Sequence, residues 1–140
     1  MQKIIVATIG VTWLLLLACG TTKNQGSSGN GEEIKNVSVD HLSQPKLVGQ
    51  YENQKVQFTA KFSKIVSGFD FVGMEQYQTT HFLVSLVSQD GKTSLPHVLV
   101  PTYEELLPTL SSNDLIQIEG VPHFTADGSA YIVVQKLEKL

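Results

Sequence analysis

The chain has 140 residues, with ten lysines, no arginine and a formal net charge of −3. Arginine supplies the planar fork that favours phosphate and base-edge contacts, so its absence and the acidic balance predict that no nucleic acid is bound. Without its first 30 or so residues, the chain is long enough for one small domain of about 110 residues with a single core. The only cysteine is Cys19, so the rest of the chain has neither a disulfide nor thiol chemistry.

Residues 1–18 are predicted to be an export signal. Lys3 precedes an apolar run over residues 4–17. About 15 helical residues span roughly 22 Å, which is short of the ~30 Å hydrocarbon core of a bilayer. Ala18 is a small residue directly before Cys19, as signal cleavage requires. A cleaved signal is therefore favoured over a permanent transmembrane helix.

The four residues Leu16-Leu17-Ala18-Cys19 resemble the lipobox of bacterial lipoprotein signals. The resemblance implies cleavage between Ala18 and Cys19, a diacylglycerol on the Cys19 sulfur and an acyl chain such as palmitate on the new amine. Residues 19–33 are then the lipidated cysteine and a flexible tether rich in Gly, Ser and Asn. Because Gly20 rather than aspartate follows Cys19, the resemblance favours anchoring in the outer membrane of the cell envelope. The alternative is an ordinary secretory signal with an incidental cysteine.

Residues 34–140 are predicted to form one β-rich domain. Ser38 is a candidate cap for a short helix that ends before Pro45, and Thr102 is a candidate cap for a second one over residues 102–107. Strict alternation of apolar and polar residues, or short apolar runs bounded by turn residues, predicts the strands. The predicted strands cover residues 56–62, 81–88, 95–100, 115–121 and 131–137.

Five short strands with a helix between the third and the fourth follow the order of an oligonucleotide/oligosaccharide-binding (OB) barrel. The stretches YENQKVQFTAKFSKI, NDLIQIEGVPHF and YIVVQKLEKL resemble the first and the last two strands of bacterial OB-like domains related to the transfer-RNA anticodon-binding type. The resemblance implies an all-β fold with one or two short helices and a five-stranded antiparallel barrel. A small antiparallel sandwich or another five-stranded barrel is the alternative.

An OB barrel usually binds its ligand on the outer face of its second and third strands. If Phe82 points into the core, alternation places His81 and Leu83 on the outer face, and His97 and Leu99 share that side. Lys61 is predicted to point outward from the first strand. Lys61, His81 and His97 are therefore a candidate face for a small ligand or a glycan, with no aromatic ring expected on it.

The segment over residues 67–80 is the most suggestive loop. Phe69, Phe71, Met74 and Tyr77 lie within this one connection, where they could form an exposed apolar rim for an envelope protein partner. The alternative is that Phe69 and Phe71 extend a strand and plug the barrel mouth. A protein partner is the first prediction, and a glycan or small ligand is the second.

No catalytic or metal-binding motif is visible in the sequence. The four histidines are far apart and lack the spacing of zinc ligands. There is no nucleophile elbow and no phosphate-binding loop, and the acidic pair Glu104-Glu105 is placed to compensate a helix dipole. We therefore expect a binding protein rather than an enzyme, without a metal and with no cofactor except the lipid on Cys19.

Overall fold

The computed structural model describes residues 32–68 and 73–140. Residues Glu32–Leu140 form one compact unit. The predicted signal, with Ala18 and Cys19, and two residues of the predicted contact loop, Phe69 and Phe71, lie outside the described residues. In the part of the chain that is described, no helix has the length and apolar character needed to cross a membrane.

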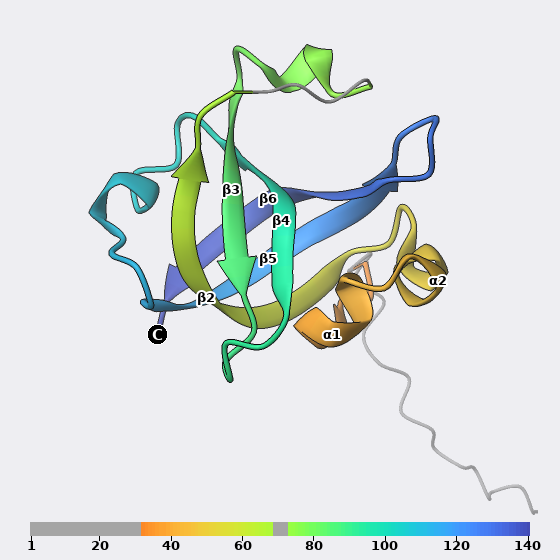
Figure 1. Cartoon of the computed structure of the whole chain (residues 1–140), viewed down its shortest axis with the longest axis horizontal. Coiled ribbons are helices and arrows are strands. Elements are labelled where there is room, and N and C mark those ends of the chain that lie inside the picture. The colour runs from red at the N-terminus through yellow and green to blue at the C-terminus, as the bar shows by residue number, and fades with distance from the viewer. Residues whose placement is uncertain (1–31, 69–72) are drawn as a thin grey trace, which may run out of the picture. The chain divides into compact units, whose positions relative to one another are not determined.

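Five strands close into a barrel, and a short sixth strand, β1, pairs with the first part of β2 (Figure 1). The order in the sheet is β1-β2-β3-β4-β6-β5, and pairing of β5 with β2 closes the barrel. Within the barrel only β4 and β6 pair in parallel, and β1 also runs parallel to β2. The predicted all-β fold with a five-stranded barrel is thus confirmed. The strands are β1 (Lys35–Asn36), β2 (Val56–Val66), β3 (His81–Val87), β4 (Ser94–Pro101), β5 (Leu115–Phe124) and β6 (Ala130–Lys139).

The helices of the described residues are single turns. They are α1 (Val39–Leu42), α2 (Pro45–Val48) and the 3-10 turns η2 (Gly49–Tyr51), η3 (Glu75–Tyr77) and η4 (Leu107–Thr109). The predicted cap of the first helix is confirmed, because the Ser38 hydroxyl accepts a hydrogen bond of 3.3 Å from the backbone N–H of His41. Val39 and Leu42 of α1 are buried in the core, so packing holds this short helix in place.

The helix predicted over residues 102–107 does not form. Residues 102–106 form turns and irregular backbone, and the 3-10 turn η4 begins at Leu107. The backbone N–H of Leu106 donates to the Glu104 carboxylate over 3.1 Å, a local bond that competes with a helical one. Pro108 has no N–H to continue a helix. Leu107 is instead buried in the main core, where tertiary packing outweighs local helix propensity.

The main core fills the barrel. Val56, Phe58, Ala60 and Phe62 of β2 all point into it, as their alternation predicts. Alternate residues of the other barrel strands join them, together with α1 and Leu107. Phe82 is an exception to the predicted pattern: it was expected inside but is 38% exposed.

A second apolar cluster lies on the outer side of β3, β4 and β6. It consists of Met74, Leu83, Leu99 and Tyr131, with Val66, Tyr77 and Val133 packed around it; we call it the outer cluster. Leu83 and Leu99 do alternate with core residues, but segment 73–80 covers this side. These strands therefore bury both faces, which explains their nearly continuous apolar runs.

Gly120 marks a close approach between β5 and β6. The register of the two strands shifts between Glu119 and Gly120, so that Gln135 of β6 becomes the extra residue of a β-bulge. A Cβ atom on Gly120 would lie 2.7 Å from the Val133 carbonyl oxygen and 2.9 Å from Cγ2 of Ile132. The bulge lets β6 place Tyr131 and Val133 in the outer cluster before it, and Leu137 in the main core after it.

Candidate functional site

The structure does not bring the predicted face of Lys61, His81 and His97 together. Lys61 pairs with Val87 at the end of β3, whereas His81 lies at the start of that strand. Six residues of a strand span about 20 Å, so Lys61 and His81 are at opposite ends. His97 lies on β4 between these ends. The three side chains therefore do not form one binding site.

The predicted contact loop is attached to the barrel rather than projecting from it. Met74 is 1% exposed, because it packs in the outer cluster on Leu83 and Leu99, so it is not part of an exposed rim. Tyr77 is half-buried at the edge of the same cluster. Of the four predicted rim residues, only Tyr77 is described and remains partly accessible.

Four rings form a continuous row along the edge of the outer cluster. The centroid of Tyr77 lies 4.9 Å from that of His81 and 5.9 Å from that of Tyr131, both in edge-on geometry. His123 stacks on Tyr131 with centroids 5.5 Å apart and an interplanar angle of 29°. We call His123, Tyr131, Tyr77 and His81 the ring row. Offset and edge-on contacts of this kind are favourable, so the rings hold one another in place.

Different elements supply the ring row. His123 and Tyr131 are register partners on β5 and β6, His81 opens β3, and Tyr77 closes the turn η3. The turn is held by hydrogen bonds from Tyr77 N–H to Met74 O and from Thr80 N–H to Tyr77 O, at 2.9 and 3.1 Å. The burial of Met74 therefore positions the Tyr77 ring.

Two loops bracket this end of the barrel. One is segment 73–80, whose Gly73 lies so close to the β5–β6 turn that an added Cβ would be 3.5 Å from the Thr125 side chain. The other is that turn itself, where Thr125 and Ser129 exchange hydrogen bonds of 2.9 and 3.1 Å with Asp127 close by. In an OB barrel these two loops flank the usual binding face.

Partial burial lowers the pKa of each histidine on this side of the barrel. Desolvation lowers the pKa of His81 and of His123, where nearby Glu52 partly opposes it. Desolvation also lowers the pKa of His97, and a hydrogen bond to the Ala130 backbone raises it by less. Burial, and then Tyr77, raise the pKa of Tyr131. At neutral pH the side chains of His81, His123 and Tyr131 are therefore uncharged.

Tyr131 and His123 were not predicted as site residues, and the expectation of a face without aromatic rings is wrong. The rings come from β5, β6 and segment 73–80, which local alternation on β3 and β4 does not reveal. One signal was present: the run Tyr131-Ile132-Val133-Val134 has no polar position, which is typical of a strand buried on both faces.

Among residues 32–68 and 73–140, no three His, Cys, Asp or Glu side chains lie close enough together to hold a metal ion. His81 and His123 belong to the ring row, His97 is hydrogen-bonded to the Ala130 backbone, and His41 is exposed. Tyr131 is only 7% exposed, so the rings available to a ligand are the partly exposed ones of Tyr77, His81 and His123, which offer stacking and hydrogen bonding.

No protein-family model and no curated protein sequence matches the chain. Solved structures do match. A replication protein A heterotrimer bound to single-stranded DNA is 13% identical with a TM-score of 0.52, over 77% of this chain and 81% of that one. An asparaginyl-tRNA synthetase from Entamoeba histolytica, in complex with asparaginyl-adenylate, is 12% identical with a TM-score of 0.51, over 79% and 24%.

A third match is a lipoprotein from Klebsiella pneumoniae, named as a candidate nucleic acid-binding protein. It is 18% identical with a TM-score of 0.50, over 76% of this chain and 92% of that one. At these identities the likeness concerns the fold alone. The predicted OB fold is confirmed, and its neighbours include a synthetase, in line with the resemblance to anticodon-binding domains.

The expectation that no nucleic acid binds is wrong as stated. It rested on the lack of arginine and on a face without rings. The ring row removes the second reason, and the matching barrels include one that is bound to single-stranded DNA. The lack of arginine and the net negative charge lower the electrostatic part of such binding but leave base stacking untouched.

Proposed function

We propose that the chain is a non-catalytic binding protein, held at the cell envelope by lipid on Cys19, that binds a ring-bearing ligand on the ring row. The single observation that carries the binding site is the continuous contact of the four rings at the usual ligand face of an OB barrel. A single-stranded oligonucleotide is the first ligand that we would test.

Stacking is the interaction that this face offers. An aromatic ring contributes about 1–3 kcal/mol per stacked base, and every base has a flat face, so such binding tolerates many sequences. The neutral ring row adds no fixed cation, and Glu52 lies near His123. We therefore expect weak binding with a shallow dependence on salt. The replication protein A and Klebsiella barrels support nucleic acid as the ligand to test first.

An envelope protein partner is the second candidate. Phe82 and Ile65 are 38% and 44% exposed. Ile65 pairs with Val84, two residues along β3 from Phe82, so their side chains are diagonal neighbours on adjacent strands. Exposed apolar pairs of this kind favour contact with a protein. In this case the apolar contact surface is not the predicted rim around Met74 but the exposed pair Ile65 and Phe82, next to His81.

The ligand proposal is tested on the exported chain with Cys19→Ser, which carries no lipid. Backbone NMR spectra are recorded while a thymidine decanucleotide or chitotriose is added. We expect shifts at the ring row, and Tyr77→Ala should weaken binding about tenfold whereas Tyr77→Phe retains it. Tyr103→Ala is the matched control, because Tyr103 is 82% exposed and outside the row. If neither probe shifts the NMR signals of the ring-row residues, the result contradicts ring stacking and favours the protein partner.

The anchor is tested separately by fractionating cells. The supporting observations are the lipobox-like Leu16–Cys19 stretch and the occurrence of this fold in a lipoprotein. With two acyl chains or more, membrane attachment is stable, so Cys19→Ser should move the protein to the soluble fraction. A variant as firmly membrane-bound as the parent chain contradicts lipid attachment at Cys19.

A further inference from the structure

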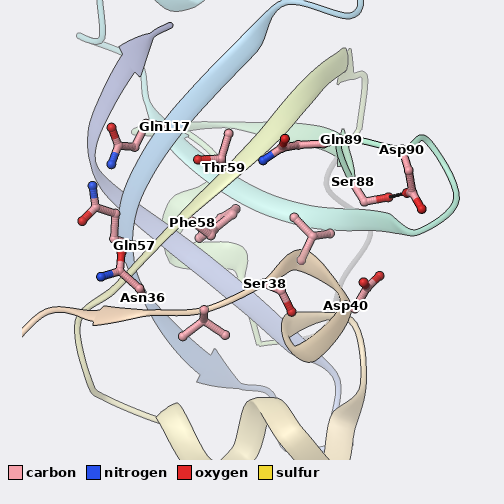
Figure 2. A pocket seen from close by; sticks show the side chains of 12 residues that line it. Asn36, Ser38, Asp40, Gln57, Phe58, Thr59, Ser88, Gln89, Asp90 and Gln117 are labelled. Carbon is pink, nitrogen blue, oxygen red and sulfur yellow. Dashed lines mark hydrogen bonds between the residues drawn. The ribbon is translucent and has the colours of Figure 1, made fainter.

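A hollow of about 490 Å³ lies at the other end of β3, away from the ring row. Its walls are β1 and the start of α1, the first part of β2, Gln117 of β5 and the β3–β4 turn (Figure 2). No residue of the ring row lines it. Six residues of β3 separate the two places, which is about 20 Å along the strand.

A gap in strand pairing produces this hollow. On one edge of β2, β1 pairs only with Val56 and Gln57, and β3 begins to pair only at Lys61. Between these points Phe58, Thr59 and Ala60 have register partners on β5 alone. The chain leaves β1 at Val37 and turns into α1 instead of continuing along the edge. The edge of β2 is therefore open over a few residues.

The hollow is closed at one side. The Thr93 hydroxyl beyond the β3–β4 turn donates a hydrogen bond to the Asp40 carboxylate of α1. The Ser88 hydroxyl donates to Asp90 over 2.5 Å and accepts from the Thr93 N–H over 3.0 Å. These bonds tie the turn to α1. The space is thus a pocket for a compact ligand and not an open groove along which an extended peptide strand could run.

Four side-chain amides give the pocket its chemistry. Figure 2 shows Asn36, Gln57 and Gln117 together on one side and Gln89 across from them, and we call this space the amide pocket. None of these amide groups hydrogen-bonds to another of the described residues. Each amide offers two donors and one acceptor oxygen, so the four can serve a ligand that both donates and accepts.

The charge of the pocket excludes an anion. Asp40 and Asp90 are the charged residues in its lining, and no lysine or histidine lines it. Hydrogen bonds, first from Ser88 and then from the Lys92 backbone, lower the pKa of Asp90, so this carboxylate is ionised at neutral pH. A phosphate or a carboxylate ligand would meet two negative charges here. A nucleic acid strand is therefore not the occupant of this pocket.

We propose that the amide pocket binds a short neutral saccharide. Sugar hydroxyls both donate and accept, which matches amides and carboxylates in one site. Val37, which is partly exposed, also lines the hollow and offers apolar contact to the C–H face of a sugar ring, while Val39 and Phe58 back the hollow from the buried core. Its volume lies in the range of about 300–1,000 Å³ that is usual for small-molecule sites. This site is distinct from the ring row and does not depend on what binds there.

The test uses the exported chain with Cys19→Ser, titrated with chitotriose and, separately, maltotriose. We expect saturable NMR shifts of the side-chain amides of Gln57, Gln89 and Gln117, with a Kd of about 1 mM or tighter. Replacing both Gln57 and Gln117 by alanine should weaken binding about tenfold, because both hydrogen-bonding groups are lost. Both residues are partly exposed, so the barrel should stay folded, which circular dichroism checks.

Gln50→Ala is the matched control, since Gln50 is an exposed glutamine of η2 outside the pocket. Unchanged affinity in this variant, with loss in the double variant, supports the proposal. No shift at the pocket amides with either saccharide overturns it. Shifts that appear only at the ring row also overturn it, while leaving the proposed function intact. A lysine-containing tripeptide is titrated as a third probe. If it shifts the NMR signals of the pocket amides and neither saccharide does, the saccharide proposal is wrong and the pocket binds a cationic peptide instead.

Discussion

The two ends of β3 carry surfaces of opposite character. Around His81 the barrel is covered by the loop turn that holds Tyr77, and aromatic rings close over buried Leu83 and Leu99. Around Val87 the edge of the sheet is open, and polar side chains line the hollow. The ring row results from added apolar packing, and the amide pocket results from a gap in strand pairing along one edge of β2.

The two surfaces depend to different degrees on the packed core beneath them. The ring row is positioned by the outer cluster, so a change beneath it alters both folding and binding. The amide pocket is lined by partly exposed side chains whose hydrogen bonds to a ligand contribute little to folding. Ligand binding at the two ends should therefore respond differently to core and surface substitutions.

The largest expected effect comes from Leu83→Ala. Leu83 is 1% exposed in the outer cluster, and such truncations cost about 2–5 kcal/mol in free energy of unfolding. Urea denaturation followed by circular dichroism measures this loss. Gln117→Ala is the contrasting change at the amide pocket and should stay within about 0.5 kcal/mol of the parent. An equal loss of free energy of unfolding in the two variants would contradict this difference between the two ends of β3.

Gly120→Ala should have a somewhat smaller effect. Gly120 lies on β5 between Gln117 of the amide pocket and His123 of the ring row, and a Cβ there would collide with the Val133 carbonyl. Because backbone must move, we expect a cost of about 1–3 kcal/mol. We also expect NMR shifts at both ends of the barrel.

Gly128→Ala is the control for the loss of a glycine as such. Gly128 has φ of +86° and open space around its Cα, so alanine there should cost about 1–2 kcal/mol through backbone strain. Its shifts should stay in the β5–β6 turn. If Gly120→Ala perturbs only the ring end, the bulge does not connect the two surfaces.

The smallest effect concerns pH. The pKa of His81, His97 and His123 is lowered in the folded chain, so below the unfolded value of about 6.5 the unfolded state binds more protons. The free energy of unfolding is therefore highest, as far as these histidines are concerned, above about pH 6.5, and it decreases as the pH falls below that value. The urea midpoint should therefore be lower at pH 5 than at pH 7.5, by a modest amount because the rings are partly exposed.

Replacing the three histidines by glutamine should flatten this dependence. The carboxyl groups of Asp90, Asp114 and Asp127 also have a lowered pKa, but their stability is lost only below about pH 4. Measurements between pH 5 and 7.5 therefore isolate the histidines. A midpoint that rises on acidification to pH 5 would contradict the direction of the histidine shifts.

The sequence by itself predicted the barrel and its five strands, because a period of two and the turn residues are local signals. It also predicted the Ser38 cap and the inward side chains of β2, whose alternation is strict. The helix over residues 102–107 failed because the burial of Leu107 outweighed local propensity. The lipid-bearing Cys19 stays a prediction from the sequence.

Only the tertiary structure decided where the two candidate sites lie. Tyr77 and Tyr131 are 54 positions apart in the chain, and nothing local indicates that their rings meet. The amide pocket likewise joins β1, β2, β5 and the β3–β4 turn at a place where pairing fails. Local patterns specify which side of a strand is apolar, whereas contacts between distant segments decide what covers that side and where an edge stays open.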